Sequence, residues 1–277
     1  MMKYTEGTDY PGIEYIKNNL DFYKQKFIDD TILVFRNANL SFEDHEQLQR
    51  VMGDVFGWSP NTSSGQTSRY IEDHSRNTNR TETNKDEVVV PWHVEHPYYD
   101  NPIVAGLWNM ITFNIESGRG NTLFLDTAKV YEMLSESDKE FLGKCIVNSY
   151  SYGIHDRMFQ TKAIKPHWLT SEPVVRFSLN DIKEGWHDLH SFDGRKPTKE
   201  ESDRYLSIAN WIVDEINNNE QLRIVHEWQQ GDVIIPDLHK LAHAVMGGFS
   251  PRDRKFTGLW SYEKDTNIYP EVDESKN

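Results

Sequence analysis

The sequence predicts an α+β fold in which helices flank a jelly roll, also called a double-stranded β-helix. Three features favour this fold: amphipathic helices open the chain, one long helix comes late, and many short apolar strands lie between them. The chain has 277 residues, enough for one large domain or two small ones. It contains no internal repeat and no long low-complexity segment. We therefore expect a single domain over residues 1–277.

Four helices are predicted from apolar residues at intervals of three and four, and from polar residues that can cap a helix: 11–28, 41–52, 127–134 and 198–216. Ser41 is expected to cap the second helix, and the acidic residues after it suit the positive end of the helix dipole. Thr127 is expected to open the third. Thr198 and Glu201, three residues apart, predict a capping box at the start of the long fourth helix.

Strands are predicted where short runs are rich in β-branched and aromatic residues: 31–36, 88–90, 103–115, 122–125, 173–179, 231–237 and 256–262. Residues 118–121 predict a turn. Residues 59–87 are rich in Ser, Thr, Asn, Gly and charge, which indicates a mobile loop. This loop is either a lid or a solvated insertion. Residues 265–277 are expected to form a polar tail.

Composition limits the possible partners. The formal net charge is -14, which argues against a nucleic-acid partner because such proteins usually carry a basic stripe. Residues 1–7 contain no apolar run of signal-peptide type, and no segment approaches the roughly 20 apolar residues of a membrane span. Cys145 is the only cysteine, so no intramolecular disulfide can form. We expect a cytoplasmic protein that binds a small molecule and no membrane, with homo-oligomerisation left open.

The main chemical signal is His93 followed two residues later by Glu95. On a strand these two side chains point to the same side. With a second histidine they would make the two-histidine, one-carboxylate triad that holds non-haem Fe(II) and leaves positions open for substrate and oxygen. His243 is the candidate, and His239 is its rival. The alternatives are a surface histidine beside a solvated glutamate, and a core histidine at position 243.

Over residues 31–262 the chain resembles the Fe(II)/2-oxoglutarate dioxygenases of the taurine dioxygenase family. The resemblance rests on four segments in order: the proximal ligand motif at 92–95, the glycine-rich turn ending in Thr-Leu-Phe at 118–124, the distal ligand region at 231–243, and the arginine segment at 251–254. It implies one dioxygenase domain.

The resemblance also implies the site residues. The iron ligands would be His93, Glu95 and His243, since the spacing in the distal segment favours His243 over His239. Arg254 would bind the far carboxylate of 2-oxoglutarate with its bidentate fork, and Thr122 would donate a hydroxyl hydrogen bond to the same group. Arg252 is the alternative clamp. The expected cofactors are Fe(II), 2-oxoglutarate and O2.

The implied activity is hydroxylation of an unactivated C–H bond in a small polar molecule, such as an amino acid or a derivative, with release of succinate and CO2. Desaturation and cyclisation stay open. A glutamate ligand is similar to the branch that includes clavaminate synthase, and Gly258 at the position of a sulfonate-binding arginine argues against taurine. Four residues are predicted to contact the substrate: His96, Tyr98, Asn101 and Arg176. The alternatives are a hydrolase with zinc in the same triad, which would leave Arg254 and Thr122 unexplained, and a non-catalytic jelly-roll binding protein.

Overall fold

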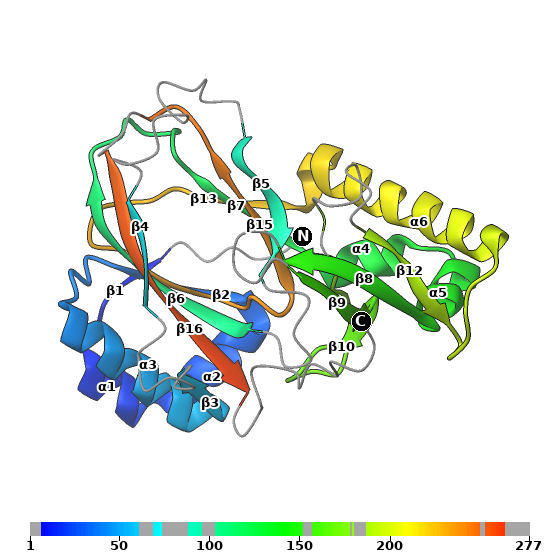
Figure 1. Ribbon diagram of the computed structural model, residues 1–277. Helices are drawn as coiled ribbons and strands as arrows, with labels where there is room; N and C mark the ends of the chain where they lie inside the picture. Colours follow the sequence, from blue (N-terminus) through cyan, green and yellow to red (C-terminus); the bar gives the residue numbers. More distant parts are fainter. Residues whose placement is uncertain are drawn as a thin grey trace.

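The computed structural model describes residues 7–60, 69–73, 88–95, 103–151, 157–177, 179, 187–249 and 253–263. Two β-sheets form the jelly roll, and helices cover both of them (Figure 1). The predicted α+β fold with a jelly-roll core is confirmed. In the described residues, no helix is long and apolar enough to cross a membrane.

The larger sheet contains β1 (Thr8–Asp9), β2 (Ile32–Arg36), β3 (Trp58–Pro60), β4 (Arg69–Asp73), β6 (Ile103–Phe113), β14 (Val233–Pro236) and β16 (Arg254–Glu263). Its strand order is β1-β2-β14-β6-β16-β3, and β4 also pairs with β16. The smaller sheet contains β5 (Val88–Val94), β7 (Thr122–Asp126), β13 (Arg223–His226) and β15 (Leu241–Met246). Its order is β13-β7-β15-β5, which places the metal-motif strand β5 at an edge.

The helices are α1 (Ile13–Asn18), α2 (Leu20–Asp30), α3 (Phe42–Phe56), α4 (Thr127–Met133), α5 (Glu136–Leu142) and α6 (Lys199–Asn218), with a short 3-10 helix at Glu220–Leu222. Ser41 caps α3 by accepting from the backbone N–H of Asp44, and the capping box of α6 is present, as predicted. The helix predicted over 11–28 is broken at Asn19, whose backbone leaves the helical conformation. Thr127 opens α4 as predicted, and Asp126 caps this helix by accepting from the backbone N–H of Ala128.

Two further sheets lie beside the smaller sheet. One contains β8 (Cys145–Ser151), β9 (Arg157–Lys162) and β12 (His187–Phe192) in the order β12-β8-β9, and the other pairs β10 (Ile164–Pro166) with β11 (Pro173–Val175). The strand predicted over 173–179 is therefore shorter than expected. It ends at Val175, and the backbone N–H of Arg176 donates to the carbonyl of Ala163.

The loop predicted over 59–87 is wrong where β3 and β4 form, because both segments pair with β16. Residues 61–68 and 74–87 lie outside the described part of the chain, as does the tail predicted over 265–277. A lid over the site stays a prediction.

The core has three layers, and strand β2 shows how they arise. Its residues Ile32 and Val34 pack in the cluster between the two sheets, whereas Leu33 and Phe35 pack against α1, α2 and α3 on the outer face of the larger sheet. Both faces of this strand are buried, so its apolar run is continuous rather than alternating. A third cluster joins the smaller sheet to α4, α5 and α6 (Figure 1).

Candidate active site

Strand register places the predicted iron ligands on the inner face of the smaller sheet. His243 of β15 lies opposite His93 of β5 on one side and opposite Phe124 of β7 on the other. Opposed residues in antiparallel strands point to the same face, and so does Thr122, two residues before Phe124. Glu95 follows the end of β5 directly. Pro91 fits within β5 because an edge strand tolerates a missing N–H.

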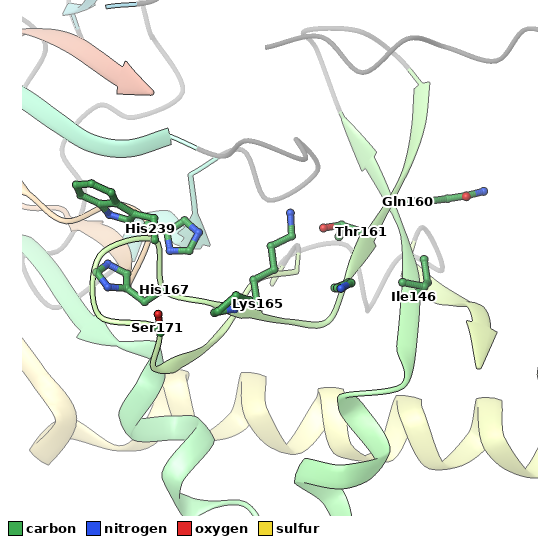
Figure 2. A pocket seen from close by; sticks show the side chains of 10 residues that line it. Ile146, Gln160, Thr161, Lys165, His167, Ser171 and His239 are labelled. Carbon is green, nitrogen blue, oxygen red and sulfur yellow. The ribbon is translucent and has the colours of Figure 1, made fainter. Parts of the chain in front are cut away.

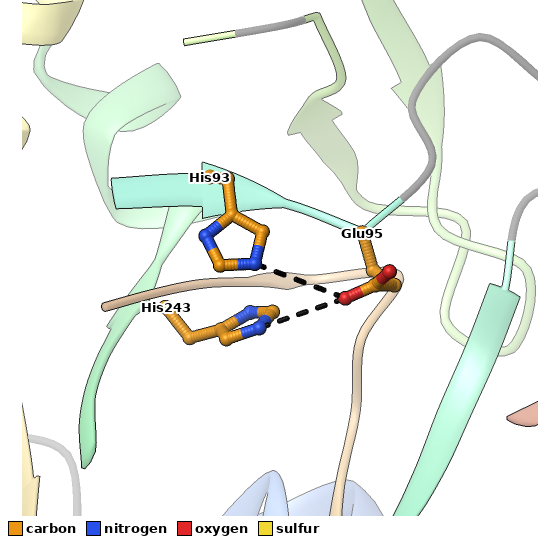
Figure 3. Close-up of side chains that lie close together, drawn as sticks. All are labelled: His93, Glu95 and His243. Atoms are coloured by element: carbon orange, nitrogen blue, oxygen red, sulfur yellow. Dashed lines mark ion pairs between the residues drawn. The ribbon is translucent and has the colours of Figure 1, made fainter. Parts of the chain in front are cut away.

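The three ligand side chains point into one space (Figure 3). Oε2 of Glu95 lies 3.9 Å from Nε2 of His93 and 3.6 Å from Nε2 of His243. Each residue offers a ligand atom, and these atoms all lie within 4.8 Å of one another. Neighbouring ligands around an ion at ~2.1 Å are about 3 Å apart, so a closure of roughly 1 Å would bring this set onto one ion. The residues fit the Fe(II) that the triad implies.

The surroundings of His93 and His243 favour metal binding. Nδ1 of His93 lies 2.8 Å from the carbonyl oxygen of Pro91, so that nitrogen carries the proton and Nε2 keeps its lone pair for a metal. His243 is only 5% exposed, and its ring lies 4.0 Å from that of His93 between centroids. Burial, followed by the nearby His93 and Arg176, holds the pKa of His243 well below its usual range. A neutral imidazole is the form that ligates a metal.

Arg254, Thr122 and Trp228 form a buried group on the inner side of the barrel. The Thr122 hydroxyl oxygen accepts from Nε1 of Trp228 at 2.8 Å and from Nη2 of Arg254 at 3.2 Å. Because that oxygen already accepts two hydrogen bonds, its own proton points away from both donors. The guanidinium of Arg254 also lies 5.3 to 6.0 Å from the ring centroids of Trp228, Phe249 and Phe256. A cation in such an apolar cage, beside a hydroxyl donor, can bind a carboxylate strongly.

Trp108 forms a wall beside the triad. Its ring centroid lies 5.2 Å from that of His243, and the residue is 6% exposed. Two glycines make room for the indole. A Cβ at Gly106 would lie 2.8 Å from Nε1 of Trp108, and a Cβ at Gly258 would lie 3.2 Å from Cδ1. Larger residues at these positions would force the indole to move.

Arg176 is fully buried, and its guanidinium donates to main-chain carbonyls. Nη2 donates to Glu95 at 2.6 Å, while Nη1 donates to Leu238 at 2.8 Å and to His239 at 3.3 Å. Burial lowers its pKa to about 10, a value at which the group is still charged at neutral pH. The cation therefore ties the backbone of one metal-ligand segment to the loop that leads into β15. This use differs from the substrate contact predicted for Arg176.

The sequence profile of the family described as "Taurine catabolism dioxygenase TauD, TfdA family" matches residues 6–260. The chain belongs to this family. It is thus an Fe(II)- and 2-oxoglutarate-dependent dioxygenase, as the sequence predicted. No curated protein sequence matches the chain.

Solved structures share the fold at low sequence identity. A taurine dioxygenase from Burkholderia xenovorans has a TM-score of 0.65 and 16% identity, over 89% of this chain and 82% of that one. A structure of AAD-2 in complex with Mn(II) and N-oxalylglycine has a TM-score of 0.60 and 14% identity, over 95% and 94%. PvcB, an Fe, alpha-ketoglutarate dependent oxygenase from an isonitrile synthetic pathway, has a TM-score of 0.58 and 15% identity, over 88% and 82%.

The residues predicted to contact the substrate are described less completely than the triad. His96, Tyr98 and Asn101 lie outside the described residues, and so does Arg252. The rival ligand His239 does not join the cluster of His93, Glu95 and His243 that the described residues form. The sequence analysis missed Trp108 and Trp228. Glycines at 106 and 258 within apolar strands were a usable signal for Trp108, since a strand glycine often marks a close approach.

Proposed function

We propose that this dioxygenase hydroxylates an unactivated C–H bond of a small polar molecule, such as an amino acid or a derivative. In this reaction 2-oxoglutarate is oxidised to succinate and CO2. One oxygen atom of O2 enters succinate, and the other enters the substrate as a hydroxyl group. The bound iron supplies the oxygen chemistry.

His93, Glu95 and His243 hold the iron in this proposal, and the observation that carries it is their convergence within 4.8 Å. Arg254 and Thr122 hold the far carboxylate of 2-oxoglutarate. The cation supplies a bidentate fork, and Trp228 orients the hydroxyl of Thr122 by donating to its oxygen. The two remaining alternatives explain less, because neither a zinc hydrolase nor a binding protein requires this buried arginine and hydroxyl pair.

The substrate class rests on two residues. Glu95 gives the carboxylate ligand a longer arm than aspartate, as in the branch that resembles clavaminate synthase and amino-acid hydroxylases. Gly258 stands where the taurine enzyme has its sulfonate-binding arginine, and a side chain there would press against Trp108. Taurine is therefore a poor candidate.

The test is an anaerobic titration of the purified protein with Fe(II) and 2-oxoglutarate. We expect the weak visible charge-transfer band of the chelate in the wild-type protein and its loss in His243→Ala and Arg254→Ala. Arg119→Ala is the matched control, because this arginine is exposed and pairs only weakly with Glu116 at 3.4 Å. Tight zinc binding with no band would refute the proposed function.

The substrate class needs product analysis. The loaded enzyme is incubated in air with a panel of amino acids and their N-acyl derivatives, and products are analysed for a mass gain of one oxygen atom. Conversion of another compound class, with no amino acid converted, would refute this part of the proposal.

A further inference from the structure

Trp108 joins the two sheets of the jelly roll beside the metal ligands. Its ring stacks on that of Phe124 in the opposite sheet, at 5.8 Å between centroids, and lies 5.2 Å from the ring of His243. The residue is 6% exposed. An indole at this depth normally has an acceptor for its N–H group, because a buried donor without one is costly.

Nε1 of Trp108 donates to no acceptor in the part of the chain that the structure describes. Trp228 has the usual arrangement, since its Nε1 donates to the Thr122 hydroxyl at 2.8 Å. Around the pyrrole edge of Trp108, a Cβ at Gly106 would lie 2.8 Å from Nε1 and 2.9 Å from Cδ1 of Leu238. A glycine and a leucine offer no side-chain acceptor, which leaves this N–H group to a bound molecule.

Strand register shows which side of the site this N–H group faces. Arg254 pairs with Phe113, whereas Gly258, four residues further along β16, pairs with Trp108. At about 3.3 Å per residue, Trp108 thus lies about 13 Å along the sheet from Arg254. Nε1 is closer to the Cβ position of Gly106, which lies further still from Arg254, than to that of Gly258. The N–H edge of the indole therefore faces away from Arg254.

The smaller sheet presents its residues in the same order. Thr122, which accepts a hydrogen bond from Arg254, lies two residues before Phe124, the strand partner of His243. Glu95 lies beyond His243 in the same direction, after the end of β5. In the proposed function 2-oxoglutarate extends from Thr122 to the metal ligands. The opposite side of the metal, which the N–H group faces, is left for the substrate.

The structure also holds a pocket of about 550 Å³ between β9, β10 and the loop that precedes β15 (Figure 2). Its lining includes neither Trp108 nor any residue assigned to the metal or to 2-oxoglutarate. A molecule bound there would be held by none of the residues of the reaction site. The contact at Trp108 is therefore the one that bears on the reaction.

We propose that Trp108 is a specificity-determining residue whose indole N–H donates a hydrogen bond to an oxygen atom of the substrate, on the side of the metal opposite to 2-oxoglutarate. The oxygen belongs to a carboxylate or to an amide carbonyl, the acceptors that amino acids and their acyl derivatives carry. This assignment rests on the proposed function, because it places the reacting C–H bond at the triad.

The first test observes the indole N–H group in a proton–nitrogen NMR spectrum. The protein is labelled in its 8 tryptophans and loaded with 2-oxoglutarate and Zn(II), which has no redox chemistry. The Trp108 signal is the one that disappears in Trp108→Phe. The probes are amino acids, the amines that lack their carboxylate, and the N-acetylated forms of these amines; leucine, isoamylamine and N-acetylisoamylamine are one such set.

We expect the Trp108 proton to move downfield with a probe that carries an oxygen acceptor and to stay in place with the matched amine. A shift with the amino acid alone identifies a carboxylate, and one with the N-acetylated amine alone identifies an amide carbonyl. The signal of Trp211, a partly buried residue of α6, should not move. An equal shift with the amine, or no shift with any probe, would overturn the proposal.

The second test separates substrate binding from co-substrate binding. Trp108 is replaced by phenylalanine and by benzothienylalanine, which keeps the bicyclic shape with sulfur in place of the N–H. By saturation-transfer NMR, we expect the affinity for the shifting probe to fall about fivefold for an amide carbonyl and at least about tenfold for a carboxylate. The Kd of 2-oxoglutarate should stay unchanged, because Nε1 faces away from Arg254. Trp211→Phe is the matched control and should change neither value.

Benzothienylalanine preserves the packing, so it keeps the test decisive if Trp108→Phe fails to fold. Unchanged affinity for the probe in the folded variants would overturn the proposal. A Kd of 2-oxoglutarate that rises as much as that of the probe would also overturn it, because the indole would then serve the co-substrate or the fold. The chelate band with Fe(II) is recorded on the same preparation of wild-type protein. Its absence refutes the proposed function separately from the result for Trp108.

Discussion

Replacing Thr122 by valine should weaken both the fold and the binding of 2-oxoglutarate. The hydroxyl oxygen is the acceptor for Nε1 of Trp228 at 2.8 Å and for Nη2 of Arg254 at 3.2 Å. Valine has the same shape but no acceptor, so two buried donors each lose a partner. At about 1–3 kcal/mol for each of the two buried donors, we expect Thr122→Val to lower the free energy of unfolding by about 2–6 kcal/mol.

A double-mutant cycle isolates the Trp228 contribution. Trp228→Phe removes the indole N–H, and the smaller ring adds a packing cost, so we expect a loss of about 2 kcal/mol. In the double variant there is no indole N–H left without an acceptor. Its loss should therefore be smaller than the sum of the single losses by about 1–2 kcal/mol. The assay is urea unfolding followed by far-UV circular dichroism on metal-free protein, which keeps ligand binding out of the comparison.

The same variants test the role of the hydroxyl in binding. Loss of one hydrogen bond to a carboxylate is worth at least about 1.4 kcal/mol, so the Kd of 2-oxoglutarate should rise about tenfold in Thr122→Val. Thr122→Ser keeps the hydroxyl and is the control. Unfolding losses that simply add, together with an unchanged Kd, would refute the reasoning.

Three other perturbations have clear expected outcomes. Arg176→Met leaves three carbonyls without their donor, so Fe(II) affinity in a metal titration should fall at least tenfold, and an unchanged affinity would contradict the positioning role. Hydrogen bonds from Arg195 first, and then from the Thr198 backbone, lower the pKa of Glu201 from 4.5 to about 2. The free energy that the ionised Glu201 contributes to folding is fully present above about pH 4.5 and is lost as the pH falls toward 2. The free energy of unfolding of Glu201→Gln should therefore change less with pH across that range than that of the wild-type protein. Burial raises the pKa of Cys145 to about 12, so iodoacetamide at pH 8 should label it only after unfolding.

Local chemistry explains which elements the sequence predicted well. Ser41 and the pair Thr198 and Glu201 cap their helices as expected, because a cap is decided by residues three positions apart. The His93 and Glu95 pair was also local, since a two-residue spacing fixes the shared side of a strand. The distant partner His243 came from the resemblance, because spacing alone gave no reason to prefer it over His239.

Strands that form by pairing with distant parts of the chain were not predicted. Strands β3 and β4 occur in a segment with the composition of a loop, and they form on the edge of β16. Strands β8, β9 and β12 were missed because polar residues interrupt their apolar ones, of which Cys145, Val147 and Leu189 pack in the cluster with α5 and α6. Propensity is a weak guide to a strand whose stability comes from its neighbours.

Arg176 shows why the roles of polar residues could not be derived from the sequence. An arginine near a predicted site suggests a ligand for an anionic substrate, but a fully buried guanidinium must first satisfy its own donors. Three carbonyls from two separate segments accept from its two terminal nitrogens here, and none is close to Arg176 in sequence. With Arg176 engaged in this way, its two terminal nitrogens are taken up by the backbone of Glu95, Leu238 and His239. That positioning role depends on contacts between segments more than 60 residues apart, which no spacing in the sequence indicates.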